Sequence, residues 1–88
     1  MKMLTFTFGD RIRKARQYLE LTQADLGELL GVHANTIVGW EADKFIPAGR
    51  AQQVYKLAEV LAVDVEWLDP TGDVRNRCFT PDPVAADA

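Results

Sequence analysis

The sequence predicts a small all-α domain, and three observations support this. Apolar residues recur at helical spacing, as at Leu26 and Leu30, which lie one turn apart on the same helix face. Residues that favour helix ends separate the apolar segments, with Thr22 before this one and Gly31 after it. The 88 residues form one domain, and a chain this short buries too little surface to build a deep enclosed pocket.

The helices are justified by their caps and apolar faces. Asp10 can cap the first helix, and Thr22 can cap the second through its hydroxyl oxygen. Ile37 and Trp40 face inward on the third helix, and Asp64 can cap the short fifth one before Pro70. On these signals we expect five helices, at about residues 11–19, 23–30, 34–42, 50–62 and 65–68.

The two ends of the chain show a different pattern. Residues 3–8 and 74–80 alternate apolar and polar side chains, which predicts a short β-strand in each segment. Residues 81–88 are rich in Pro, Asp and Ala, and we expect them to be disordered. The predicted organisation is therefore an arm at residues 1–8, a helical domain at 9–70 and an extension at 71–88.

Composition restricts the function classes. The net charge is −3, but residues 1–56 carry eight basic and six acidic side chains, whereas residues 57–88 carry two basic and seven acidic ones. This split permits a nucleic-acid-binding front, since local charge decides contact with phosphate. Cys78 is the single cysteine, and the sequence shows no metal-ligand cluster, signal peptide or membrane span. We expect an intracellular protein without disulfide, metal or cofactor.

One segment carries the functional signal. Residues 22–41, TQADLGELLGVHANTIVGWE, form two short helices around a tight glycine turn, and they resemble the helix-turn-helix of the Cro/phage-repressor (XRE) family. The resemblance extends to GDRIR at 9–13, LAEVLAV at 57–63 and EWL at 66–68. It implies a five-helix lambda-repressor-like fold over residues 9–70. Gly27 would lie where the two helices cross, where a side chain larger than that of Ala would push them apart.

The resemblance also implies roles for individual residues. Arg16 and Glu41 match a pair that joins the first and third helices by a charge-assisted hydrogen bond. The third helix would enter the major groove, where Asn35 is the strongest candidate reader because an amide can bond adenine at two positions. The residues expected to face base edges are Asn35, Ala34 and Gly39. Those expected to contact phosphate are Gln23, His33, Thr36, Lys44 and Arg50.

Three features of the sequence bear on this expected interface. Gly39 offers almost no side chain for base contact, and Asp43 stands where the family commonly has glycine. Asp can adopt the left-handed conformation, but its charge repels phosphate. The linker before Leu57 is also longer than usual, which leaves the loop contacts open.

The resulting interpretation is a sequence-specific regulator of double-stranded DNA, of the Cro-like or phage-type repressor class. It would act as a homodimer on a palindromic operator in the cytoplasm of a bacterium or phage-infected cell. The terminal strands would pair to extend the dimer interface, with exposed Leu29 as a further apolar element; alternatively, the N-terminal strand covers its own core. No catalytic constellation is visible, so we do not expect an enzyme.

A second function class stays open. The same scaffold could serve as a protein–protein adaptor, such as an antitoxin-like or phage-encoded binder of a host protein. The negative net charge, together with Ala34 and Gly39 at reading positions, favours this alternative. Salt-dependent DNA binding distinguishes the two.

Overall fold

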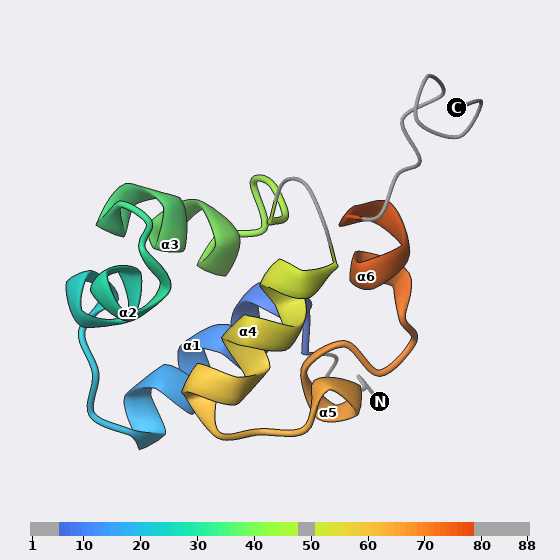
Figure 1. Ribbon diagram of the computed structural model, residues 1–88, viewed down its shortest axis with the longest axis horizontal. Helices are drawn as coiled ribbons and strands as arrows, with labels where there is room; N and C mark the ends of the chain where they lie inside the picture. Colours follow the sequence, from blue (N-terminus) through green and yellow to red (C-terminus); the bar gives the residue numbers. More distant parts are fainter. Residues whose placement is uncertain (1–5, 48–50, 79–88) are drawn as a thin grey trace, which may run out of the picture.

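The computed structural model describes residues 6–47 and 51–78. All regular secondary structure in these residues is α-helical (Figure 1). The all-α prediction is confirmed, with one helix more than expected. None of the described helices has the length and apolar character needed to cross a bilayer. The helices are α1 (Phe8–Tyr18), α2 (Gln23–Leu30), α3 (Ala34–Glu41), α4 (Gln52–Leu61), α5 (Val65–Leu68) and α6 (Asp73–Cys78).

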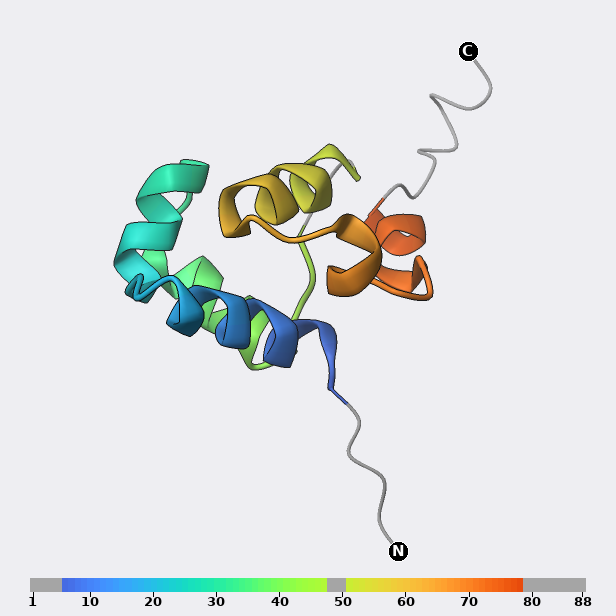
Figure 2. The same cartoon turned by 90° about the horizontal axis from the view of Figure 1, so that it is seen from below.

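The helices enclose a single apolar core. α2 and α3 lie at one end of the molecule, α5 and α6 at the other, and α4 spans the space between them in both views (Figures 1 and 2). α3 packs against both α2 and α1. The buried apolar residues are Ile12, Ala15, Leu26, Leu30, Ile37, Trp40, Val54, Leu57, Ala58, Leu61, Leu68 and Val74.

The connection between α2 and α3 follows the sequence prediction. Thr22 is the N-cap of α2 and forms a capping box with Asp25, and Gly31 ends the helix in the left-handed conformation with φ 75°. A Cβ atom on Gly27 would lie 2.6 Å from the carbonyl oxygen of Val32. Only glycine therefore lets the turn pass this close to α2 without a backbone shift, a stricter limit than the sequence predicts, which allows alanine.

The predicted N-terminal strand is wrong within the described residues. α1 begins at Phe8, three residues earlier than expected, because Thr7 is its N-cap and forms a capping box with Asp10. Asp10 is therefore the third helical residue and not the cap. Gly9, which follows the predicted strand, is buried inside α1. Residues 3–5 of the predicted strand lie outside the described range.

The predicted C-terminal strand is also wrong, because residues 73–78 form α6. The buried Asp69 carboxylate accepts the backbone N–H groups of Val74 and Arg75, at 3.1 and 2.9 Å, and also pairs with the Arg75 guanidinium. This carboxylate supplies the partners that the first turn of a helix lacks, and Val74 is buried in the core. Residues 79–88, including the segment predicted to be disordered, lie outside the described range.

Two helix starts differ in detail from the prediction. α4 begins at Gln52 after Ala51, which makes no side-chain capping bond. Asp64 occupies the N-cap position of α5 as expected, but its side chain makes no capping hydrogen bond either. Pro47, in the loop before α4, is fully buried. Residue 50, where the fourth helix was expected to begin, lies outside the described range together with residues 48 and 49.

Gly9→Ala should destabilise the fold, because a Cβ at this position would lie 2.4 Å from the carbonyl oxygen of Trp40 and 2.5 Å from that of Glu41. Both neighbours are backbone atoms, so α1 must move away from α3. We expect a loss of about 1–3 kcal/mol in the free energy of unfolding, measured by urea denaturation. Gln17→Ala on the exposed face of α1 is the control, expected within about 0.5 kcal/mol of wild type. Equal effects of the two changes would contradict the close approach.

The two capping boxes should make stability depend on acid pH. Hydrogen bonds with Thr7 lower the pKa of Asp10 below its ordinary value of 3.8, and hydrogen bonds with Thr22 do the same for Asp25. A lowered folded pKa contributes stability above the unfolded value, which is lost as pH falls through the folded one. The double variant Asp10→Asn, Asp25→Asn should therefore be less stable than wild type at neutral pH, and the difference should vanish in strong acid. Urea denaturation across this pH range measures it, and a difference that stays constant with pH would refute the assignment.

Candidate nucleic-acid interface

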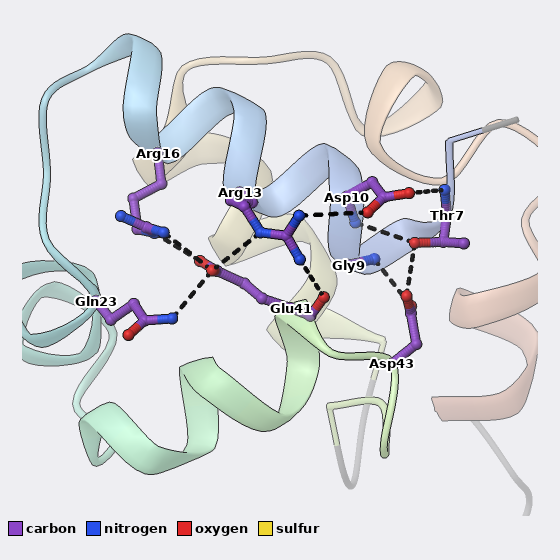
Figure 3. Close-up of polar contacts among 8 residues, drawn as sticks. All are labelled: Thr7, Gly9, Asp10, Arg13, Arg16, Gln23, Glu41 and Asp43. Carbon is purple, nitrogen blue, oxygen red and sulfur yellow. Dashed lines mark hydrogen bonds and ion pairs between the residues drawn. The ribbon is translucent and has the colours of Figure 1, made fainter. Parts of the chain in front are cut away.

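A buried carboxylate at the end of α3 ties three elements together. The Glu41 side chain is 3% exposed and accepts hydrogen bonds from both Nε and Nη2 of Arg16 on α1 (Figure 3). Gln23, in the first turn of α2, donates its Nε2 to Glu41 Oε1 at 3.1 Å. The Glu41 hydrogen bonds raise the pKa of the Arg16 guanidinium. This bidentate pair fixes α3 relative to α1 and α2.

A second arginine completes the network. Arg13 donates Nη2 to the backbone carbonyl of Glu41 at 3.0 Å, and its Nε lies 3.7 Å from Oε1 of the same residue. Arg16 also donates Nη1 to the carbonyl of Leu21, just before α2. In the described part of the chain, every buried side-chain nitrogen and oxygen has a hydrogen-bond partner. Complete pairing offsets the cost of removing these charges from water.

Asp43 forms a second link between the end of α3 and the start of α1. Its carboxylate accepts the Thr7 hydroxyl at 2.6 Å and the backbone N–H of Gly9 at 3.0 Å (Figure 3). Asp43 adopts the left-handed conformation, with φ 58°. The sequence marked it only as a departure from glycine, but the carboxylate serves as an additional cap for α1, which glycine cannot supply. No sequence signal connects positions 36 residues apart.

The N-terminus of α2 presents backbone donors next to Gln23. The first N–H groups of a helix have no partner within it, and the helix dipole favours an anion there. Gln23 is partly buried, and its amide donates to Glu41. An amide nitrogen carries two hydrogens, so this bond leaves one for another acceptor. The side chain is therefore held in place at a site suited to phosphate.

The N-terminus of α3 is capped by its own imidazole. His33 Nδ1 accepts the backbone N–H of Asn35 at 3.0 Å. A neutral imidazole that accepts at Nδ1 carries its proton on Nε2, so this exposed ring can donate outward. Asn35 is exposed on the first turn of α3. These two neighbours offer a donor for phosphate and an amide for a base edge, respectively.

The expectation that Gly39 faces a base edge needs correction. Gly39 is buried, because the ring of Phe45 lies over it: a Cβ atom at this position would be 2.1 Å from Cζ of Phe45. The backbone N–H of Lys44 also bonds to the Gly39 carbonyl at 3.0 Å, which folds the following loop back onto α3. Phe45 itself is 49% exposed. No pattern in the sequence marks Phe45, because the loop after Lys44 consists of apolar residues, proline and glycine.

The remaining predicted contact residues are less distinctive. Ala34 and Thr36 are partly buried on α3, and Lys44 is exposed in the loop after it. Arg50 lies outside the described range. Two basic residues of α1 are engaged elsewhere: Arg11 lies over the rings of Phe6 and Trp67, and Lys14 also lies over Phe6. The predicted contact residues that the structure describes thus lie on α3, at the N-termini of α2 and α3, and in the loop after α3. The α1 arginines make contacts within the protein.

α3 runs along the outer edge of the molecule in Figure 1, with the N-terminus of α2 beside it. Asn35 and Val38 are exposed on α3, and so is its C-cap residue Ala42. Among the described residues, no three His, Cys, Asp or Glu side chains gather to hold a metal ion. The surface can offer hydrogen bonds and apolar contact.

Comparison with known proteins decides the family. The helix-turn-helix family model HTH_3 matches residues 12–68. The chain belongs to this family. The matched residues of this helix-turn-helix protein include α2, α3 and the whole Glu41 network, whereas Thr7 and Asp10 at the start of α1 lie before the match. Comparison with curated protein sequences gives no match.

Solved structures resemble this helix-turn-helix protein over most of its length. The crystal structure of the P22 c2 repressor in complex with synthetic operator 9T is 33% identical with a TM-score of 0.66, and the match covers 73% of this chain and 94% of that one. The solution structure of the P22 c2 repressor DNA-binding domain is 31% identical, with a TM-score of 0.67 and coverage of 94% and 99%. SinR, the master regulator for biofilm formation, in complex with DNA is 26% identical, with a TM-score of 0.63 and coverage of 70% and 97%.

Glu41→Gln should strongly destabilise this helix-turn-helix protein. The change leaves the Arg16 guanidinium, whose side chain is 11% exposed, without a counter-charge. We expect a loss of about 3 kcal/mol in the free energy of unfolding by urea denaturation. Glu28→Gln on the exposed face of α2 is the matched control and should change stability by less than about 0.5 kcal/mol. A loss below about 1 kcal/mol, the range of an exposed ion pair, would show that the network is not structurally decisive.

Proposed function

We propose that this protein, a DNA-binding transcriptional regulator of repressor type, binds a palindromic operator as a homodimer. In this proposal, α3 enters the major groove and the N-termini of α2 and α3 contact phosphates on either side. The bound repressor would then exclude polymerase from the DNA sterically, and this needs neither catalysis nor a cofactor. It would act in the cytoplasm of a bacterium or phage-infected cell. The observation that carries the proposal is the Glu41 network, which fixes the recognition helix at the molecular edge with Gln23 beside it.

The proposed phosphate contacts follow from the helix ends. Gln23 and His33 lie at the N-termini of α2 and α3, where unpaired N–H groups and the helix dipole attract anions. Lys44 is exposed in the loop after α3 and adds a positive charge. Thr36 and Arg50 stay in the proposed phosphate set on the family resemblance. These contacts set register and affinity but carry no direct sequence information.

Base recognition in this proposal depends chiefly on Asn35. Its amide is exposed in the first turn of α3 and can bond adenine N6 and N7 together. Ala34 is partly buried and can offer only a methyl contact to thymine. The P22 c2 repressor and SinR structures hold operator or DNA, which supports DNA as the partner here.

The homodimer is proposed from the geometry of operators. A single recognition helix reads few base pairs, and repressors of this architecture bind two half-sites about 34 Å apart. We no longer propose paired terminal strands as the interface, since within the described residues Phe8 belongs to α1 and residues 74–78 belong to α6. Leu29 is 52% exposed and Trp67 39% exposed, so apolar side chains are available at the surface.

Selection of bound duplexes from a random-sequence pool tests the proposal, with wild type and two variants run in parallel. Wild type should enrich a palindrome, and its affinity should fall with log[salt] at a slope of about −0.9 per phosphate contacted. Asn35→Ala should lose about 1–3 kcal/mol of discrimination at one base pair of the palindrome. Gln23→Ala should weaken binding to all sequences alike and leave the consensus unchanged.

The outcomes separate the two function classes. No retention of DNA at about 50 mM salt would overturn the proposal and favour the adaptor alternative. An unchanged consensus with Asn35→Ala would remove this residue as the reader. A single non-repeated half-site in the enriched sequences would contradict the homodimer.

A further inference from the structure

The aromatic ring over Gly39 occupies the place of a reading side chain. Gly39 follows Asn35 by four residues, so both lie on the same face of α3. The space into which a side chain at position 39 would extend is filled by the Cζ, Cε1 and Cε2 atoms of Phe45, all within 2.8 Å of the ideal Cβ position. The glycine and the aromatic ring therefore form a matched pair, although they belong to a helix and a loop.

The ring is also placed for contact with a partner. Phe45 is 49% exposed, although it packs on a helix at the molecular edge. It borders a hollow of about 240 Å³ whose wall also includes Thr36 from α3 and Gln53 from α4. Val32, Trp40 and Ile46 complete the lining, so most of the residues around the hollow are apolar. Exposed Lys44 precedes the ring and supplies a positive charge at its side.

We propose that Phe45 is a specificity-determining residue that reads the C5-methyl group of a thymine in the major groove. The proposal rests on the DNA binding proposed above and adds a reader that the helix itself lacks at Gly39. The thymine methyl is the apolar feature of the major-groove floor, and aromatic side chains are among its partners. Asn35 lies one turn away from Gly39 on the same face of α3. Asn35 and Phe45 together would therefore read an adenine and a thymine.

The test uses the highest-affinity duplex recovered from the random pool, with each thymine replaced in turn by uracil. Uracil lacks only the C5-methyl group, so a lost contact should weaken wild-type binding about fourfold, the equivalent of one buried methylene. Phe45→Ala should bind uracil and thymine equally at one position and keep the thymine preference at all others. Tyr55→Ala is the matched control, since Tyr55 is 50% exposed on α4 and lies beside Arg75.

A second variant tests the ring position without removing the ring. Gly39→Ala places a Cβ atom in the space of the Phe45 ring and should abolish the same methyl preference. In the Phe45→Ala background the Gly39→Ala change should have no further effect on that preference. Thermal unfolding of each variant shows whether the fold is retained, and the half-exposed Phe45 predicts that Phe45→Ala folds.

The results distinguish this inference from the function on which it depends. Failure to recover any duplex would overturn both the DNA binding and the reader. Recovery of a duplex whose methyl preferences are identical in wild type and Phe45→Ala would overturn the reader alone. Loss of the preference in the Tyr55→Ala control would also overturn it, because the effect would not be specific to Phe45.

Discussion

The structure depends on one buried carboxylate. Glu41 lies at the end of the recognition helix, and its two oxygens engage Arg16 of α1 and Gln23 of α2. A charge this deeply buried is tolerated only when it is fully paired, which restricts the three helices to one arrangement. The candidate phosphate ligand Gln23 is held by the same carboxylate. Structural stability and the geometry of the proposed interface therefore have a common origin.

A second constraint is the close approach of α1 to the end of α3. Gly9 permits the contact because it has no side chain, and the Asp43 carboxylate caps α1 from the loop after α3. The loop must reverse direction at Asp43, which adopts the left-handed conformation. It then carries Phe45 back over Gly39. The same short segment thus fixes α1 and completes the outer surface of α3.

Much of the fold could be predicted from the residues. The Thr22 cap, the Gly31 helix end and the close crossing at Gly27 are local features whose chemistry is readable in the sequence. Within the described residues, the terminal strands were predicted wrongly for a physical reason. A few alternating residues favour a strand only weakly, and a nearby capping group that starts a helix outweighs them. Thr7 starts α1 early, and Asp69 supplies the cap that allows α6 to form.

The sequence by itself determined the helix-turn-helix and its end signals at Thr22 and Gly31, because these depend on neighbours within a few residues. The contacts at Gln23, His33 and Asn35 follow from the family resemblance and stay predictions. The tertiary structure decided which side chains occupy the outer surface of α3. Gly39 seemed a reading position, yet its space belongs to Phe45. Asp43 seemed a charge facing phosphate, yet it caps α1. Both outcomes depend on how the loop after α3 packs, and packing between distant segments leaves no periodic or local signal in a single sequence.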